Sequence, residues 1–298
     1  MSQQTRLFAP VNADSERTPV IEFPPGHAGY GDEVYQARRT VMAEAALNHR
    51  PGDEPPHITY AVQDHMCWDH ISRALTPLWR TYATAEVQEA LENLALPTGH
   101  VPQLSKVSRR LETLTGFTFS PAAGIVPLER FYGSLADSTF HSTQFIRHHS
   151  RPLFSPEPDM VHEVMGHGAT LASPRFADLY RKVGAAARRA ETRESLKAVS
   201  RIFWFTLEYG LLGEADSAEV YGASLLSSYG ELHAFRGVEI RSLDVRQMAT
   251  QPYDVTEYQP VLFTARSLNE LEDFLGGFLS DVDGDTGARL GVTADQRW

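Results

Sequence analysis

Hydrophobic residues recur every three or four positions along most of the chain, the pattern of helices that bury one face. After Asp32, for example, the apolar positions are Val34, Ala37, Val41 and Ala45. This periodicity predicts helices over residues 33–50, 63–83, 84–94, 104–114, 128–135, 173–190, 194–212 and 268–279. Strands are predicted at residues 117–121 and 139–146, and a strand or loop at 253–263. The expected fold class is therefore mainly α, with a few short β-strands.

The 298 residues are enough for one large domain with a substantial core. Residues 1–26 are rich in Pro, Gly and polar residues, so we expect an N-terminal arm there. Residues 27–280 carry the periodic segments and form the predicted domain. Residues 281–298 are rich in Gly and Asp and are predicted to be a C-terminal tail.

The composition is that of an ordinary globular protein, and its charge excludes some partners. The net charge of −11 argues against a general affinity for nucleic acid or anionic membranes. Cys67 is the single cysteine, so the chain has no intrachain disulfide and fits a reducing compartment. No segment is typical of a signal peptide or a membrane span. We therefore expect a cytoplasmic protein.

Two histidines, His162 and His167, follow a proline-spaced acidic run at residues 155–159 that is typical of a helix entry. Their separation differs from the four residues of the zinc-hydrolase motif H-E-x-x-H. Five residues on a regular α-helix turn two side chains roughly 140° apart. Both rings can therefore reach one metal only on a distorted or ending helix, which Gly166 and Gly168 permit. Taken alone, the pair is equally compatible with two structural histidines.

Glu208 is the residue that favours a metal site. Its helical neighbours at three and four positions are all hydrophobic: Trp204, Phe205, Leu211 and Leu212. A carboxylate in such surroundings is costly unless a positive group pairs with it. Two histidines and one carboxylate on an otherwise open site are the ligand set of non-haem Fe(II) oxygenases.

Several segments together resemble the catalytic domain of the pterin-dependent aromatic amino acid hydroxylases, and phenylalanine hydroxylase most of all. They occur in the order of that family, between about residues 27 and 271: TGFTFSPAAG, FHSTQFIRH, PEPDMVHEVMGH, WFTLEYGL, YGASLLSSYGEL and TEYQP. The resemblance implies the hydroxylase catalytic-domain fold for residues 27–280. It also implies Fe(II), tetrahydrobiopterin or a related tetrahydropterin as cofactors, and an aromatic amino acid as substrate.

The resemblance also implies a role for particular residues. Fe(II) would be held by His162, His167 and Glu208. Arg147 would bind the substrate carboxylate, oriented by Asp159, and Ser227 would hydrogen-bond a metal-bound histidine. The other implied substrate-binding residues are Ser155, Trp204 and Val255. The implied pterin-binding residues are Gly124, Val126, Leu128, Phe131, His141 and Glu163.

Some of these positions bear on specificity. By the same resemblance, Trp204 is expected to disfavour an indole substrate, and Val255, apolar where the tyrosine enzyme has an acid, is expected to favour phenylalanine over tyrosine. Four residues depart from the usual pattern of the family and are expected to lie near iron, pterin or substrate. Ala169 stands in place of Pro, Ser224 of Gly, Phe203 of Tyr and Leu128 of Ser.

The resulting expectation is a monooxygenase that uses O2 and reduced pterin to hydroxylate L-phenylalanine at the para carbon, giving tyrosine. The alternative is a phenylalanine 3-hydroxylase giving meta-tyrosine, because the four departures cluster around the geometry that selects the carbon. Less favoured are a tyrosine or tryptophan hydroxylase, a zinc hydrolase with Glu163 as base, and a non-catalytic pterin- or metal-binding protein. We expect a monomer or small oligomer.

Overall fold

The computed structural model describes residues 21–293, and these form a mainly helical body with two small sheets. The α-helices are α1 (Glu33–Leu47), α2 (Val62–Tyr82), α3 (Ala85–Leu94), α4 (Leu104–Thr115), α5 (Leu128–Leu135), α6 (Gly168–Leu171), α7 (Pro174–Arg189), α8 (Arg193–Phe203), α9 (Ala223–Ser227), α10 (Tyr229–Ala234), α11 (Val245–Thr250), α12 (Leu268–Ser280) and α13 (Thr286–Leu290). Two π-helices, η2 (Val161–His167) and η3 (Trp204–Glu208), and two 3₁₀ turns, η4 (Ala215–Ser217) and η5 (Phe235–Gly237), complete the helical part. The predicted fold class is confirmed.

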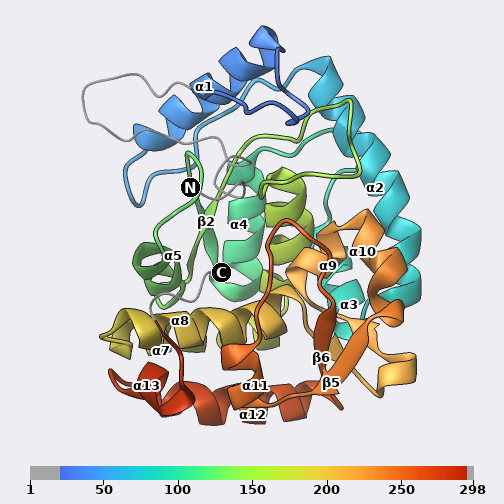
Figure 1. Cartoon of the computed structure of the whole chain (residues 1–298). Coiled ribbons are helices and arrows are strands. Elements are labelled where there is room, and N and C mark those ends of the chain that lie inside the picture. The colour runs from blue at the N-terminus through green and yellow to red at the C-terminus, as the bar shows by residue number, and fades with distance from the viewer. Residues whose placement is uncertain (1–20, 294–298) are drawn as a thin grey trace.

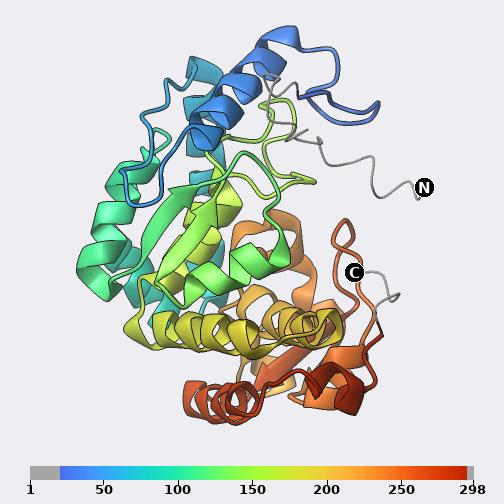
Figure 2. The same ribbon diagram turned by 90° about the vertical axis from the view of Figure 1, so that its left-hand side faces the viewer.

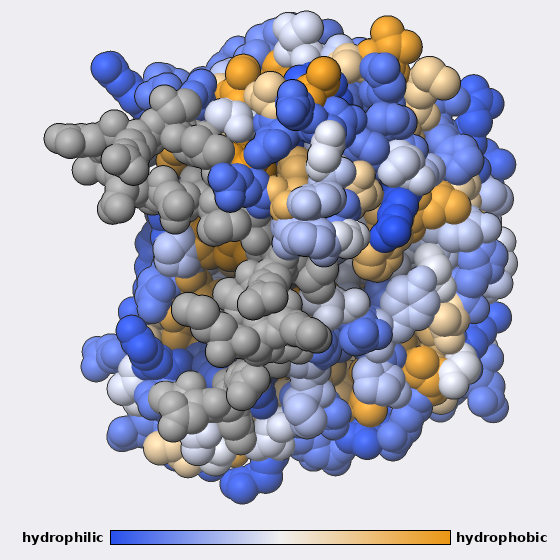
Figure 3. Space-filling view, turned by 45° about the horizontal axis from the view of Figure 1, so that its top comes forward, coloured by the Kyte–Doolittle hydropathy of each residue, from blue (hydrophilic) through white to orange (hydrophobic). Residues whose placement is uncertain are grey.

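The helices are arranged between two ends of the molecule. In both ribbon views α1 lies at one end, and α12 and α13 lie at the other (Figures 1 and 2). Helices α7 and α8 cross the molecule between them, next to the C-terminal helices (Figure 1). No helix within residues 21–293 is long and apolar enough to cross a membrane. The face in Figure 3 is mostly hydrophilic outside the grey atoms, with hydrophobic side chains in small separate groups.

The strands are short and serve mainly to connect segments that are distant in the sequence. Strands β1 (Thr118–Pro121) and β2 (Thr139–Ser142) pair in parallel, with Phe119 opposite Phe140. The second sheet has the order β4-β3-β6-β5, from β3 (Leu211–Leu212), β4 (Glu219–Val220), β5 (Glu239–Ser242) and β6 (Val261–Ala265). Strand β6 is parallel to both β3 and β5, whereas β4 is antiparallel to β3.

Several local predictions are confirmed. Thr84 caps α3, because its hydroxyl accepts a hydrogen bond from the Val87 amide. The helix predicted over residues 63–83 is present as α2, with Pro77 in its interior. The strand predicted from residue 117 begins at Thr118, and the helix predicted at residues 128–135 has those bounds.

Other predictions are wrong in instructive ways. The helix predicted over residues 194–212 ends at Glu208, because Leu211 and Leu212 leave it to pair with β6 and β4. The predicted tail contains α13, which packs on α8, and the Gly287 amide donates to the Ser195 hydroxyl at 3.0 Å. The part of the tail after residue 293 and most of the predicted N-terminal arm, residues 1–20, lie outside the described residues.

Close packing of η2 against α9 holds the segment that carries both histidines. A Cβ atom placed on Gly166 would lie 2.5 Å from the Ala223 carbonyl oxygen, which is backbone and cannot move aside cheaply. The helix pair therefore requires a residue without a side chain at this position.

We expect Gly166→Ala to lower the free energy of unfolding by about 1–3 kcal/mol, the usual cost of overpacking. Gly133→Ala is the matched control, since Gly133 lies within α5 and a Cβ there meets no atom within 4 Å. That control should be neutral or stabilising by up to about 1 kcal/mol. Denaturant unfolding of the chelator-treated proteins measures both, and equal stabilities would contradict the packing argument.

Candidate active site

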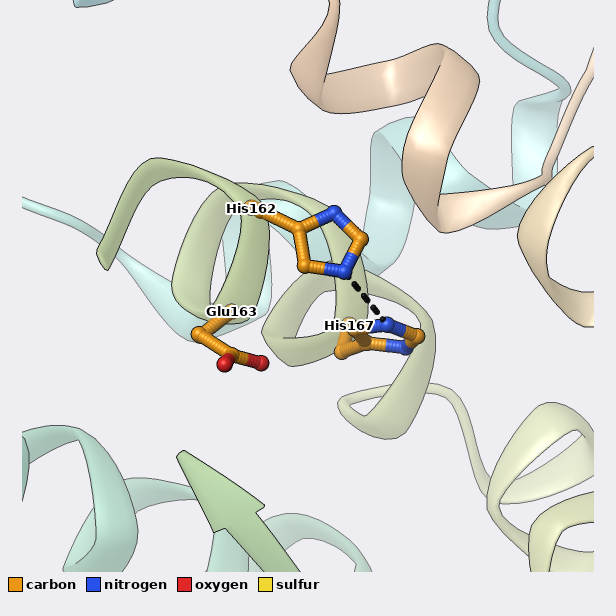
Figure 4. Close-up of side chains that lie close together, drawn as sticks. All are labelled: His162, Glu163 and His167. Carbon is orange, nitrogen blue, oxygen red and sulfur yellow. Dashed lines mark hydrogen bonds between the residues drawn. The ribbon is translucent and has the colours of Figure 1, made fainter. Parts of the chain in front are cut away.

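The π-helix η2 brings His162 and His167 to the same face. A π-helix closes its hydrogen bonds between residues five apart, so side chains at that spacing lie above one another. The Gly168 amide bonds to the Glu163 carbonyl oxygen in this way. The two Nε2 atoms consequently lie 3.0 Å apart (Figure 4). The distorted helix that a shared metal requires is therefore present.

Glu208 reaches the same point from the second π-helix, η3. Its Oε1 lies 3.1 Å from Nε2 of His167, and its Oε2 lies 3.9 Å from Nε2 of His162. The Tyr209 amide bonds to the Trp204 carbonyl oxygen, again five residues back. Both protein segments that supply candidate ligands are thus widened helices.

Proton counting identifies the tautomer of His162. Its Nδ1 lies 3.2 Å from the Ser227 hydroxyl oxygen, and that hydroxyl donates its one proton to the Ala223 carbonyl at 2.9 Å. The Ser227 oxygen can then only accept, so Nδ1 of His162 must carry a proton. The predicted contact between Ser227 and a metal-site histidine is present.

The same reasoning applies to His167. Its Nδ1 lies 2.8 Å from the Tyr180 hydroxyl, which is also 3.0 Å from the Thr170 hydroxyl. When Thr170 donates its proton to the His167 carbonyl oxygen, Tyr180 donates to Thr170 and accepts from Nδ1 of His167. Both histidines therefore direct an unprotonated Nε2 into the site.

Three possible metal ligands converge here, two imidazole nitrogen atoms and one carboxylate. Burial raises the pKa of Glu208, but His167, His162 and Ser224 together lower it to about 2, so the carboxylate is ionised. Burial, and then the neighbouring His167, lowers the pKa of His162 to about 4. Such donors repel one another unless a cation lies among them. Two imidazoles and one carboxylate fit Fe(II) by number, type and protonation state.

Glu163 is a competing carboxylate, because one of its oxygens lies within 4.8 Å of nitrogen atoms of both histidines. In Figure 4 its carboxylate lies to one side of the dashed line that joins the two rings. Burial raises the pKa of Glu163 well above its ordinary value, which disfavours the ionised form that a metal ligand needs. Its carboxylate accepts from the Thr143 amide at 3.3 Å. Glu208 is the better third ligand.

Arg147 and Asp159 form a buried ion pair at the edge of the site. The Arg147 amide and Nε donate to Oδ2 at 2.8 and 2.9 Å, and Nη2 donates to Oδ1 at 2.7 Å. Burial raises the pKa of Asp159, but Arg147 reverses this and leaves it below the ordinary value. Arg147 faces the cavity while Asp159 lies behind it, fully buried. The expected orienting contact is therefore present.

One cavity of about 940 Å³ joins these groups, and nearly all the sequence-predicted site residues line it. Besides the candidate ligands and Arg147, they are Gly124, Val126, Leu128, Phe131, His141, Ser155, Glu163, Phe203, Trp204, Ser224, Ser227 and Val255. Asp159 and Ala169 are fully buried and do not line it. Of the four departures from the usual pattern, Leu128, Phe203 and Ser224 therefore line the cavity, and the nearness of Ala169 to the reacting groups stays a prediction.

Aromatic side chains form much of the cavity wall. Phe131 stands edge-on to Phe140 and Phe203, with ring centroids 5.3 and 6.2 Å apart. Trp204 stacks on Tyr253 at 4.4 Å, and its Nε1 donates to the Gln259 amide oxygen at 3.2 Å. These contacts hold flat surfaces on which an aromatic ligand can pack.

Sequence reasoning missed several residues of the site. Tyr180 and Thr170 set the tautomer of His167, yet Tyr180 reads in the sequence as one more apolar position of α7. Glu231 lines the cavity and accepts from the Gln259 amide at 3.1 Å. Burial raises the pKa of Glu231 to about 7. Glu231 lies within the YGEL segment, but its distance in the sequence from the two histidines gave no reason to place it at the site.

Known proteins of similar sequence include a phenylalanine 3-hydroxylase from Streptomyces coeruleorubidus, which is 45% identical over 264 residues. That alignment covers 89% of this chain and 95% of the relative. Phenylalanine-4-hydroxylase of Mus musculus is 37% identical, and tyrosine 3-monooxygenase of Bos taurus is 39% identical. Each alignment covers 86% of this chain, which spans 58% and 53% of the length of these mammalian relatives.

Solved structures share the fold. Phenylalanine hydroxylase from Legionella pneumophila superimposes with a TM-score of 0.72 at 27% identity, covering 82% of this chain and 97% of that one. The cobalt-bound phenylalanine hydroxylase from Chromobacterium violaceum has a TM-score of 0.75 at 24% identity, covering 87% and 94%.

The sequence profile of one family matches residues 19–289, and its description is biopterin-dependent aromatic amino acid hydroxylase. This match spans nearly all of the described chain, including both π-helices and the cavity between them. The chain belongs to the biopterin-dependent aromatic amino acid hydroxylases.

Proposed function

We propose that the chain is an Fe(II)- and tetrahydropterin-dependent monooxygenase that hydroxylates L-phenylalanine at the meta carbon, giving 3-hydroxyphenylalanine. The observation that carries this proposal is 45% identity to a phenylalanine 3-hydroxylase, along 95% of that relative. Identity to the phenylalanine-4-hydroxylase of Mus musculus is 37%. The para product expected first from the sequence therefore gives way to the alternative.

Fe(II) and the reduced pterin, when bound, supply the electrons with which O2 is split and one oxygen atom enters the aromatic ring. His162, His167 and Glu208 would hold the metal, since their free electron pairs converge. Ser227 and Tyr180 keep the two imidazoles in the tautomer that presents Nε2. The protein therefore holds its ligand atoms ready in a buried site.

Arg147 would bind the carboxylate of phenylalanine. Asp159 occupies Nε and Nη2 of Arg147, and this bidentate contact fixes the plane of the guanidinium group. Trp204 would pack on the substrate side, held by its stacking on Tyr253 and its bond to Gln259. Ser155 and Val255 line the same cavity. These residues orient the ring and exclude water.

The pterin would lie against Phe131 and the loop that carries Gly124, Val126 and Leu128. Burial and the nearby Arg130 lower the pKa of His141 to about 4, so this ring is neutral at pH 7 and can both donate and accept. Glu163 adds a buried carboxyl on this side of the cavity.

Three finer features belong to the same proposal: location, oligomeric state and partners. A cytoplasmic location is supported by the single cysteine, Cys67, which is buried and without a disulfide. A monomer or small oligomer is proposed, with phenylalanine, O2 and the reduced pterin as its small-molecule partners. The net charge of −11 argues against nucleic acid and anionic membranes as partners.

The first prediction concerns the metal. Purified protein should bind about one iron per chain, and His162→Ala, His167→Ala and Glu208→Ala should each lose iron and activity, because a missing ligand leaves the set incomplete. Glu163→Gln should retain iron. Metal analysis after dialysis measures the iron content of all four variants. Iron loss in Glu163→Gln together with retention in Glu208→Ala would mean that Glu163, and not Glu208, is the third ligand.

The second prediction concerns the substrate. Arg147→Ala should weaken phenylalanine binding by about 2–5 kcal/mol, the cost of truncating one partner of a buried charge pair, with iron content nearly unchanged. Calorimetric titration with phenylalanine measures the loss. Arg73→Ala is the control, because Arg73 pairs with Asp69 on the exposed surface. Lost iron with unchanged phenylalanine affinity would refute the proposed role of Arg147.

The third prediction concerns the product. Chromatography against authentic tyrosine isomers should identify meta-tyrosine as the main product from phenylalanine. Leu128→Ser, Phe203→Tyr and Ser224→Gly should each raise the para fraction, because these side chains line the cavity. Ala169→Pro is the matched control outside the cavity. A wild-type product that is para-tyrosine alone would refute the proposed position of attack.

A further inference from the structure

Ser224 makes a short contact with the candidate metal-binding carboxylate. It lies in α9 at the cavity wall, is 9% exposed, and its hydroxyl donates to Oε2 of Glu208 at 2.6 Å. A hydrogen bond to an ionised carboxylate is shorter and stronger than one between neutral groups. Since a hydroxyl has one proton, this bond uses the whole donor capacity of Ser224.

This contact makes the two oxygens of Glu208 different. Oε1 lies 3.1 Å from Nε2 of His167, toward the point where the donors converge. Oε2 carries the bond from Ser224 and lies 3.9 Å from Nε2 of His162. A carboxylate held in this way presents Oε1 to the point of convergence, while the bond from Ser224 ties Oε2 to α9.

Ser224, Tyr209 and Glu231 line the same cavity. The hydroxyl of Tyr209 donates to Oε2 of Glu231 at 3.4 Å, and the backbone amide of Gln259 donates to Oε1 of Glu231 at 3.1 Å. Ser224, Tyr209, Glu231 and Gln259 are all buried, so water competes little for the bonds that they make. Of these four residues, Ser224 is the one that donates to Glu208.

We propose that Ser224 is a positioning residue that restricts Glu208 to binding the metal through Oε1 alone. The inference rests on the proposed metal site of His162, His167 and Glu208. A carboxylate that bound through both oxygens would occupy one more position on the metal. Ser224 therefore keeps that position open for the reaction in this chain, because glycine or alanine at 224 would offer no hydroxyl to hold Oε2.

The test is a set of crystal structures of the protein loaded with Co(II), a probe that needs neither pterin nor turnover. In the wild type, only Oε1 of Glu208 should lie at bonding distance from cobalt. In Ser224→Ala and Ser224→Gly, Oε2 should turn in to a second bonding contact. Ser224→Thr keeps the hydroxyl and should restore the wild-type arrangement. The visible absorption of the cobalt proteins should sort the variants in the same way in solution.

Ser195→Ala is the matched control, because it removes a buried hydroxyl that donates to the Gly284 carbonyl and does not line the cavity. It should leave cobalt geometry and spectrum unchanged. One-oxygen binding in Ser224→Ala, or an unchanged spectrum in that variant, would overturn the role of Ser224 while leaving the metal site intact. A wild-type protein that binds no cobalt at these residues would instead refute the proposed metal site.

Discussion

The five-residue spacing of His162 and His167 is the constraint on which the rest of the site depends. A regular helix would direct the two rings apart, so η2 must widen to a π-helix before both Nε2 atoms can meet. A widened turn gives up regular hydrogen bonds and must be stabilised by its neighbours. Gly166 provides that support by allowing the α9 backbone to approach η2 closely. The same helix α9 carries Ser224 and Ser227, so one packing contact brings two hydroxyl groups to the ligands.

The second requirement is to bury charges without leaving them unpaired. Glu208, Asp159 and Arg147 are all buried, and an unpaired charge in such surroundings costs several kcal/mol. Asp159 and Arg147 satisfy each other, which fixes the guanidinium group that faces the cavity. Glu208 has the Ser224 hydroxyl and the two imidazoles, and the latter present electron pairs rather than protons. Its charge is therefore balanced fully only by a cation, which links metal binding to the stability of this part of the core.

The sequence predicted the elements whose pattern is local. Helix α5, the start of α3 at Thr84 and the buried surroundings of Glu208 all follow from spacing along a single segment. Prediction from the sequence failed where a contact with a distant segment determines the structure. The end of η3 depends on the pairing of the following residues with β6. Helix α13 forms because the 286–292 segment buries residues against α8. The contact that orients the His167 ring could not be predicted for the same reason, since Tyr180 lies thirteen residues beyond His167 and meets it only in the folded chain. Ala169, two residues after His167 in the sequence, is buried and does not line the cavity.

The residues found by motif and the side chains that shape the cavity wall differ in which property of the enzyme they can change. The residues found by motif establish the kind of chemistry, and nearly all of them would be needed whichever carbon of the ring is oxidised. The position of attack depends instead on displacements of roughly 1 Å, which are enough to change a rate a hundredfold. Small side chains at the cavity wall produce displacements of that size without disturbing the ligands. Ser224 belongs to both classes, because it lines the cavity and also bonds to Glu208. A substitution there would therefore alter the shape of the substrate space and the arrangement of the candidate metal-binding carboxylate together, whereas Leu128 lines the cavity and Phe203 lines it while stacking on His167.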